Sequence, residues 1–291
     1  MRREGLVFDV TTAGRPGGRP VVLLHGFPQS ARCWDAVTPA LTGAGCRTHA
    51  PDQRGYSPGA RPVGRGAYRM SSLVADALAV VDEARAEAGG APVHLVGHDW
   101  GALVAWRLAA RYPDHLATLT ALSVPPPAAF ARAALNPGQA LASWYVLAFQ
   151  LPWLPEWSLG AGRGERFSER FVRSLTASGL SRAAAERDAA FLAGPGALTA
   201  ALNWYRAIPL DLLPFDGGGP VDPPVRVPTL FVWSDGDVAV TRAAADRAGD
   251  HVSGLYRFVE LRGTSHWIPD EAPDALAPLL LDMIGDGRSP S

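Results

Sequence analysis

The 291-residue chain lacks several features that would assign it to a specialised class of protein. It has only two cysteines, Cys33 and Cys46, and their spacing fits neither a disulfide framework nor a metal site. Its 27 basic residues are all arginine and are balanced by 28 acidic residues, with no basic cluster that would bind a phosphate backbone. The sequence therefore argues against a disulfide-rich secreted protein, a metalloprotein and a nucleic-acid-binding protein.

Long hydrophobic runs are also missing. The N-terminal segment MRREGLVFDV has two arginines but no apolar run after them long enough for a signal peptide. The uncharged stretch 133–155 is broken by Pro137, Gly138 and Pro152. Its clean apolar run, 140–151, is shorter than the about 20 residues that a membrane-spanning helix needs. We therefore expect a cytoplasmic protein without a membrane segment, and we interpret this run as the wall of an apolar pocket.

The composition instead fits a large folded core, with 47% hydrophobic residues and nine tryptophans against 19% charged residues. Short apolar runs bounded by Pro, Gly or Asp alternate with segments whose apolar residues recur at helical spacing. This pattern is typical of an α/β fold, in which a mostly parallel sheet is covered by helices on both faces. The expected strands are 20–26, 46–52, 92–98, 117–124, 227–233 and 255–261, and the expected helices are 71–88 (with a serine N-cap), 102–112 and 273–284.

The alternating pattern is interrupted after the prolines at 125–127. Residues 128–222 carry Trp- and Ala-rich helical segments without strand signals, separated by glycine-rich breaks at 160–164, 194–196 and 216–220. We therefore predict one sheet domain made of 1–127 and 223–291, with a helical cap, or lid, of 128–222 inserted between its strands. The last residues, 285–291, are expected to fray.

Three polar residues stand where predicted strands end, and ligands of open α/β sheets bind at the carboxyl ends of the strands. They are Asp99 in GHDWG, Asp237 in WSDGD and His266 in GTSHW. Their order along the chain, nucleophile, acid and histidine, is that of hydrolases in which a strand-to-helix turn carries a serine nucleophile. In this chain an aspartate stands at that turn.

A carboxylate changes the chemistry because it is already ionised at neutral pH, with an ordinary pKa of about 3.9. Asp99, placed before the helix that begins at Trp100, is predicted to attack an sp³ carbon directly and form an ester. His266 would then take a proton from a water molecule that attacks this ester, while Asp237 orients the imidazole. The backbone N–H groups of Phe27 and Trp100 are the expected oxyanion hole.

Alkyl halides and epoxides are the two substrate classes that suit such a nucleophile. A halide leaving group needs N–H donors that are not basic. An epoxide oxygen becomes a basic alkoxide and needs an acid such as tyrosine, with an ordinary pKa of about 10. The distinction depends on which donors face the nucleophile.

The chain contains five short motifs: HGFP (25–28), DQRGY (52–56), GHDWGA (97–102), SDGD (234–237) and SHW (265–267). Together they resemble the α/β-hydrolase superfamily, and most closely its epoxide hydrolase branch. The resemblance covers nearly the whole chain and implies a helical lid over a sheet core, with conversion of an epoxide to a vicinal diol.

Two lid motifs carry the more specific part of this resemblance. WYVLAFQLP (144–152) and NWYRA (203–207) are similar to the two tyrosine-bearing segments of epoxide hydrolases. The resemblance implies that Tyr145 and Tyr205 hydrogen-bond the epoxide oxygen and donate a proton as the ring opens. Asp235 also follows its strand closely enough to be the acid, and Asp237 is preferred because it occupies the position that the family motif indicates.

Two alternative functions stay open at this point. A haloalkane dehalogenase would use the same nucleophile, and the Trp100 indole N–H is compatible with halide binding. Against it, Phe27 stands where such enzymes often have a polar halide donor, and two lid tyrosines would be unexplained. The other alternative is a catalytically silent hydrolase-like binding protein, although such proteins typically lose one member of the triad.

The expected substrates are a small hydrophobic epoxide and water, bound in an apolar pocket without a metal or cofactor. Other polar residues are expected to be structural, with His25 and His98 organising the catalytic turns and Asp52 paired with Arg54. The sequence is compatible with a homodimer. The expected pocket residues are Phe27, Trp100, Trp144, Phe149, Trp204 and Trp267.

Overall fold

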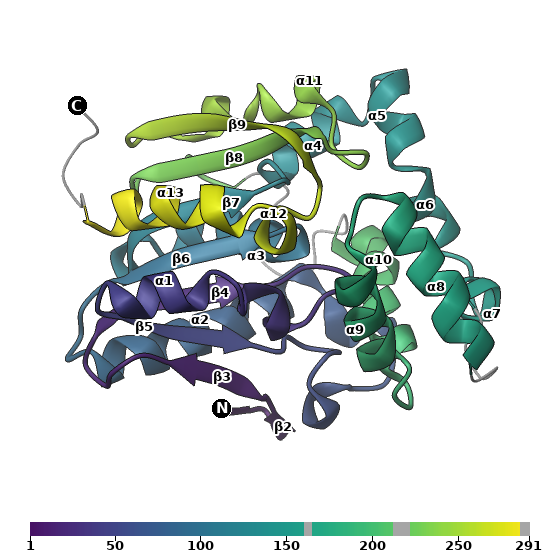
Figure 1. The fold of residues 1–291 in the computed structure, drawn as a ribbon, viewed down its shortest axis with the longest axis horizontal. Helices are drawn as coiled ribbons and strands as arrows, with labels where there is room; N and C mark the ends of the chain where they lie inside the picture. Colours follow the sequence, from purple (N-terminus) through teal and green to yellow (C-terminus); the bar gives the residue numbers. More distant parts are fainter. Residues whose placement is uncertain (160–164, 212–221, 286–291) are drawn as a thin grey trace.

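The computed structural model describes residues 1–159, 165–211 and 222–285 (Figure 1). The glycine-rich breaks 160–164 and 216–220, and nearly all of the expected frayed tail, lie outside the described residues. Among the described residues, no helix combines the length and the apolar character needed to cross a membrane.

The described residues form a seven-stranded sheet in which only the first pair of neighbours is antiparallel. The six strands expected from the sequence are all present, and the central ones are buried on both faces, which explains their continuous apolar runs. In sheet order the strands are β3 (Val10–Ala13), β5 (Cys46–Pro51), β4 (Arg19–Leu24), β6 (Val93–His98), β7 (Leu116–Leu122), β8 (Thr229–Gly236) and β9 (Tyr256–Ser265).

The N-terminal strands are not among those predicted from the sequence. The edge strand β3 pairs antiparallel with β5, and β1 (Arg2–Arg3) and β2 (Leu6–Val7) form a separate two-stranded sheet. These strands are short and partly exposed, so they carry no continuous apolar run that would reveal them.

Helices cover both faces of the sheet (Figure 1). On one face, α1 (Thr38–Gly43) and α13 (Pro273–Gly285) bury Leu41, Leu276 and Leu280 in one apolar core. On the other face, α2 (Met70–Glu87) and α3 (Trp100–Arg111) contribute to a second, larger core that continues into the helical region. The short helices α11 (Arg242–Ala245) and α12 (Ile268–Glu271) follow β8 and β9.

The described part of 128–222 contains helices and no strand, as the sequence predicts. After α4 (Pro127–Ala133), six helices stack beside the sheet in Figure 1, and we call these six helices the cap. They are α5 (Pro137–Ala142), α6 (Trp144–Ala148), α7 (Leu154–Leu159), α8 (Glu165–Ala177), α9 (Arg182–Leu192) and α10 (Ala197–Asp211).

Two predicted local contacts near α2 were wrong. The helix begins at Met70, and the carboxylate of Asp211, 3.2 Å away, accepts the Met70 N–H in place of a serine cap. Arg54 does not pair with Asp52. It bonds the Asp76 carboxylate on α2 through two contacts of 2.6 and 2.9 Å, whereas Asp52 accepts the backbone N–H of Ala31.

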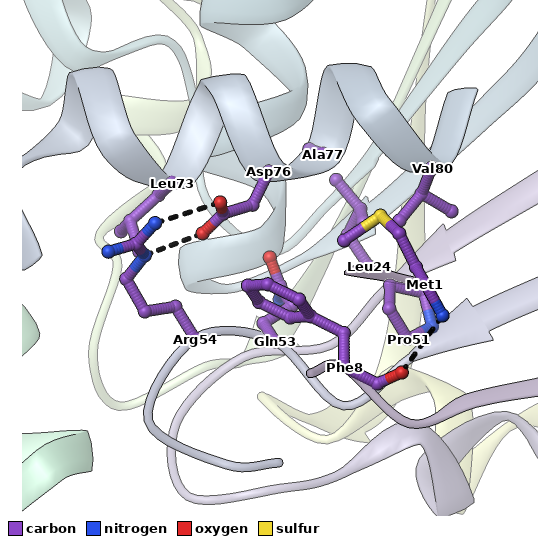
Figure 2. Close-up of a pocket in the computed structure, with 10 residues that line it drawn as sticks. All are labelled: Met1, Phe8, Leu24, Pro51, Gln53, Arg54, Leu73, Asp76, Ala77 and Val80. Atoms are coloured by element: carbon purple, nitrogen blue, oxygen red, sulfur yellow. Dashed lines mark hydrogen bonds and ion pairs between the residues drawn. The ribbon is translucent and has the colours of Figure 1, made fainter. Parts of the chain in front are cut away.

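The Arg54–Asp76 pair borders a small pocket near the N-terminus, closed by Met1 and Phe8 (Figure 2). Its volume of about 10 Å³ is at the lower limit of the space that one water molecule needs. This pocket is too small for an organic substrate, and none of the predicted catalytic residues lines it.

Candidate active site

The turn between β6 and α3 places Asp99 at a sharp bend. Its backbone has φ 54° and ψ −119°, a conformation that residues other than glycine rarely adopt and that is typical of a nucleophile elbow. The bend depends on the two glycines that flank it. A Cβ on Gly101 would lie 2.2 Å from the Leu24 carbonyl oxygen, and one on Gly97 would lie 2.3 Å from the Gly101 carbonyl oxygen.

The two oxygens of Asp99 have different environments. Oδ1 accepts the Phe27 backbone N–H at 2.8 Å, and the Trp100 backbone N–H also bonds the carboxylate. Oδ2 lies 3.5 Å from Nε2 of His266. Burial raises the pKa of Asp99, but the hydrogen bond and charge of His266 outweigh it and hold this pKa below its ordinary value. The side chain is therefore an ionised carboxylate with one oxygen held and one available.

His266 lies between two carboxylates. Its Nδ1 is 2.7 Å from Oδ2 of Asp237, whose side chain is fully buried. Burial lowers the pKa of His266, but Asp237 and Asp99 together raise it to about 10. Asp235 does not reach the histidine, because its carboxylate accepts the N–H of Gly263 at the surface. The geometry thus favours Asp237 over Asp235 as the orienting acid.

The two lid tyrosines lie together above the carboxylate of Asp99, and all three residues line the same cavities. The ring centroids of Tyr145 and Tyr205 are 6.0 Å apart, and the Trp100 side chain hydrogen-bonds Tyr205. Burial, and then the charge of Asp99, raise the pKa of both phenols. Both hydroxyls therefore carry their protons and can donate them.

Two side chains that the sequence analysis did not single out hold the tyrosine helices together. Gln150 donates from Nε2 to the Tyr205 carbonyl oxygen at 2.7 Å, and so ties the end of α6 to α10. Arg206 donates to the carbonyl oxygens of Phe149 and Leu151 at 3.1 and 2.9 Å. Gln150 and Arg206 lie inside the two quoted lid motifs, so the motifs themselves were the signal that could have found them.

Gln139 on α5 links the cap to the loop that carries Asp237, the orienting acid. Its Oε1 accepts the backbone N–H and the hydroxyl of Thr241, and its Nε2 donates to the Ala239 carbonyl oxygen at 2.7 Å. The same loop donates the N–H groups of Ala239 and Val240 to Oδ1 of Asp237. Gln139 is buried, and no local sequence pattern indicates this contact, which spans about a hundred residues.

Two cavities meet at the carboxylate and the tyrosines. The larger has a volume of about 900 Å³ and the smaller about 380 Å³, and both are lined mainly by apolar side chains. The uncharged run 140–151 contributes Leu141, Tyr145 and Phe149 to the larger cavity, as the sequence interpretation expects. Of the expected pocket residues, the larger cavity is lined by Phe27, Trp144, Phe149 and Trp267, and the smaller by Trp100.

Trp204 is a correction to the predicted pocket. It is absent from the described lining of both cavities and fully buried, and its Nε1 donates to the Arg54 carbonyl oxygen at 2.7 Å. Adjacent residues on a helix point about 100° apart. Because Tyr205 faces the cavity, Trp204 faces the core, where its ring packs against Tyr56 and Trp100.

The two nearby histidines support the catalytic turns in different ways. His25 accepts the Gln53 N–H at Nε2, and burial lowers its pKa to about 4, so it is a neutral structural group. His98 bonds through Nε2 to the carbonyl oxygen of His266 at 2.9 Å, and therefore braces the base rather than the nucleophile turn. Among the described residues, no group of three or more His, Cys, Asp or Glu side chains could hold a metal ion.

Comparison with known proteins agrees with this geometry. Residues 19–273 match the family described as alpha/beta hydrolase fold. The chain is 33% identical to epoxide hydrolase A of Mycobacterium tuberculosis, covering 97% of this chain and 95% of that protein. It is 34% identical to the AB hydrolase superfamily protein YfhM of Bacillus subtilis, covering 98% and 96%.

Solved structures give the same result. The crystal structure of epoxide hydrolase A from Mycobacterium thermoresistibile superposes with a TM-score of 0.80 at 28% identity, covering 97% of this chain and 96% of that one. Epoxide hydrolase VrEH1 from Vigna radiata superposes with a TM-score of 0.79 at 27% identity, with the same coverage. The chain therefore belongs to the α/β-hydrolase superfamily, in its epoxide hydrolase branch.

Proposed function

We propose that this protein hydrolyses a hydrophobic epoxide to a vicinal diol through an ester of Asp99. The observation that carries the proposal is the pairing of an ionised carboxylate with two protonated phenols that line the same cavities. The carboxylate supplies a nucleophile, and the phenols supply the acid that an epoxide oxygen requires.

In the first step, Oδ2 of Asp99 attacks one epoxide carbon and the bond from that carbon to the epoxide oxygen breaks. Oδ1 is already held by the Phe27 N–H, so Oδ2 is the oxygen free to attack. Tyr145 and Tyr205 hydrogen-bond the departing oxygen, and one of them donates its proton to the alkoxide and becomes a phenolate. Burial keeps the pKa of both phenols raised, but as negative charge leaves Asp99 the further rise that this charge causes is removed, so proton transfer becomes easier as the ring opens.

In the second step, His266 activates water. Esterification neutralises Asp99 and removes one of the two charges that raise the pKa of His266, so the imidazolium can give its proton to the phenolate formed in the first step and then act as a base. Water attacks Cγ of Asp99, and the oxyanion that develops on Oδ1 is stabilised by the N–H groups of Phe27 and Trp100. The bond from Cγ to Oδ2 breaks, the departing oxygen takes the proton that His266 removed from water, and the diol leaves with Oδ2. The regenerated carboxyl of Asp99 then gives its proton to His266, which restores the starting state.

The hydrogen bond between the side chains of Trp100 and Tyr205 disfavours the alternative function of haloalkane dehalogenase. The Trp100 side chain is engaged by the Tyr205 hydroxyl, whereas a halide would need that N–H free. The silent-scaffold alternative leaves the joint placement of Asp99, His266 and Asp237 without a purpose.

The proposed reaction needs only the epoxide and water, and no cofactor. The two cavities suit an epoxide with apolar substituents on both ring carbons, one in each cavity. Three expectations from the sequence stay proposals. The first is the division into a core of 1–127 and 223–291 with an inserted helical lid of 128–222. The others are a cytoplasmic location and a homodimer.

The test offers the protein styrene oxide and, separately, a bromoalkane, and measures diol and bromide. Diol formation supports the proposal, and bromide without diol rejects it in favour of a dehalogenase.

A single turnover in heavy-oxygen water tests the ester step. The label should enter Asp99, and label appearing directly in the first diol would reject the covalent mechanism.

A further inference from the structure

A cluster of polar side chains joins the cap to two core segments. Arg187 on α9 contacts Asp270 twice, Nη1 to Oδ1 at 2.8 Å and Nη2 to Oδ2 at 3.1 Å. Its Nε and Nη2 also bond the neighbouring Asp188, whose side chain is fully buried. Gln29, buried as well, donates its amide N–H to the same Asp270 carboxylate. Two-pronged contacts between guanidinium and carboxylate fix orientation as well as distance, so the cluster holds three segments in one arrangement.

The two core members of this cluster, Asp270 and Gln29, are close in sequence to groups of the hydrolytic step. Asp270 lies on α12, four residues after His266. Gln29 lies two residues after Phe27, whose backbone N–H binds Oδ1 of Asp99. One arginine of the cap therefore binds the segment of the base directly, and the Asp270 carboxylate that it binds also accepts the hydrogen bond from the segment of the oxyanion hole.

A second set of contacts, independent of Arg187, places the same part of the cap against His266. Trp267 donates its indole N–H to the hydroxyl of Ser178 at 3.1 Å, in the turn between α8 and α9. The next residue of that turn, Gly179, has φ +104°, and a Cβ there would lie 2.4 Å from Cβ of Ser265. Both sequence neighbours of His266 thus touch the turn that leads into the helix of Arg187.

We propose that Arg187 is a positioning residue for hydrolysis of the ester, acting through Asp270 on His266 and, by way of Asp270 and Gln29, on the Phe27 N–H. This inference rests on the proposed function. Water activation and oxyanion stabilisation belong to the same step. The first depends on the segment of Asp270 and the second on the segment of Gln29, and the cluster around Arg187 joins these two segments. Alkylation depends on Asp99, Tyr145 and Tyr205, which the cluster does not contact.

Steady-state kinetics separate the two steps. When alkylation is irreversible, kcat/KM reflects binding and alkylation alone, whereas slower hydrolysis lowers kcat and KM together. In Arg187→Gln with styrene oxide we expect hydrolysis of the ester to slow by about 10²-fold, the size of effect that a misplaced group can have. The ester should accumulate in acid-quenched samples analysed by intact-protein mass spectrometry, and kcat/KM should stay within about twofold of the wild type.

Arg182→Gln is the matched control. Arg182 lies on the same helix, and its ion pair with Glu186 is exposed, so this variant should keep the wild-type kinetics. Arg187→Lys keeps the charge and one hydrogen bond to Asp270 and should recover part of the hydrolysis rate. If Arg187→Gln does not fold, Asp270→Asn removes the ion pair without changing the size of the side chain and is measured in the same way.

Equal losses in alkylation and hydrolysis would overturn the inference, because they would show a general loss of structure. A lower unfolding temperature with unchanged hydrolysis would overturn it as well, because Arg187 would then only anchor the cap. A wild-type protein that makes no diol would overturn both the proposed function and this inference. Wild-type turnover with no accumulation of ester in the Arg187 and Asp270 variants would overturn this inference alone.

Discussion

At the scale of single residues, the two oxygens of the Asp99 carboxylate have different roles: one attacks the substrate, and the other later carries the charge of the oxyanion. Oδ1 of Asp99 accepts the Phe27 N–H and Oδ2 faces His266, so an ester formed at Oδ2 already has its carbonyl oxygen at the Phe27 N–H of the expected oxyanion hole. We therefore predict that His266→Gln still forms the ester but cannot hydrolyse it, because glutamine cannot take a proton from water. Mass spectrometry during turnover should show the adduct in His266→Gln and none in Asp99→Asn. An unmodified His266→Gln protein would contradict the two-step mechanism.

The tyrosines give a second prediction at this scale. Phenylalanine in place of Tyr145 or Tyr205 keeps the ring and its aromatic contacts and removes only the proton donor. If the phenols donate to the alkoxide, each variant should slow alkylation by about 10²–10⁴-fold, measured in a single turnover with excess enzyme. Tyr56→Phe is a matched control, because Tyr56 is a buried ring outside both cavities and should leave alkylation unchanged. Unchanged alkylation in both lid variants would return the tyrosines to a packing role.

At the scale of elements, the sequence predicted what depends on local pattern. Strands such as β4 and β6 are buried on both faces, so their apolar runs are continuous and visible in the sequence. The edge strand β3 has one paired neighbour and a partly exposed polar sequence, and it was missed. Trp204 was misplaced because composition marks a tryptophan as apolar but does not say which side of α10 it faces.

Contacts between distant elements could not be predicted from the sequence either. Gln139 is an example of such a contact, and it affects the loop that carries Asp237. Gln139→Leu leaves the half-buried Thr241 N–H and Ala239 carbonyl oxygen without their partner, at a cost below the about 1–3 kcal/mol of a fully buried unsatisfied group. We expect a lower midpoint of urea unfolding and a lower kcat, because the same loop holds Asp237. Thr241→Val, which removes only the hydroxyl contact to Gln139, should have the smaller effect on both. A Gln139→Leu protein with wild-type kcat would mean that the loop holds Asp237 without help from α5.

At the scale of the whole molecule, stability should depend on the charge state of His266. Burial lowers the pKa of this histidine, but Asp237 and Asp99 raise it to about 10 in the folded protein. The unfolded chain has an ordinary histidine pKa of about 6.5, so the folded state binds the proton more tightly. The stabilisation from this proton is therefore fully present below about pH 6.5 and is lost as the pH rises towards 10.

The unfolding temperature of the wild type should accordingly fall as the pH rises above about 7, measured by scanning calorimetry across this range. In Asp99→Asn one of the two carboxylates is neutral, so the pKa of His266 should be lower and the loss of stability should be complete at a lower pH. The same comparison imitates the ester, in which Asp99 is also neutral. If the two proteins lose stability over the same pH range, then Asp99 does not raise the pKa of His266. In that case alkylation could not be what converts the imidazolium into a base, and its proton would have to be lost before the epoxide binds.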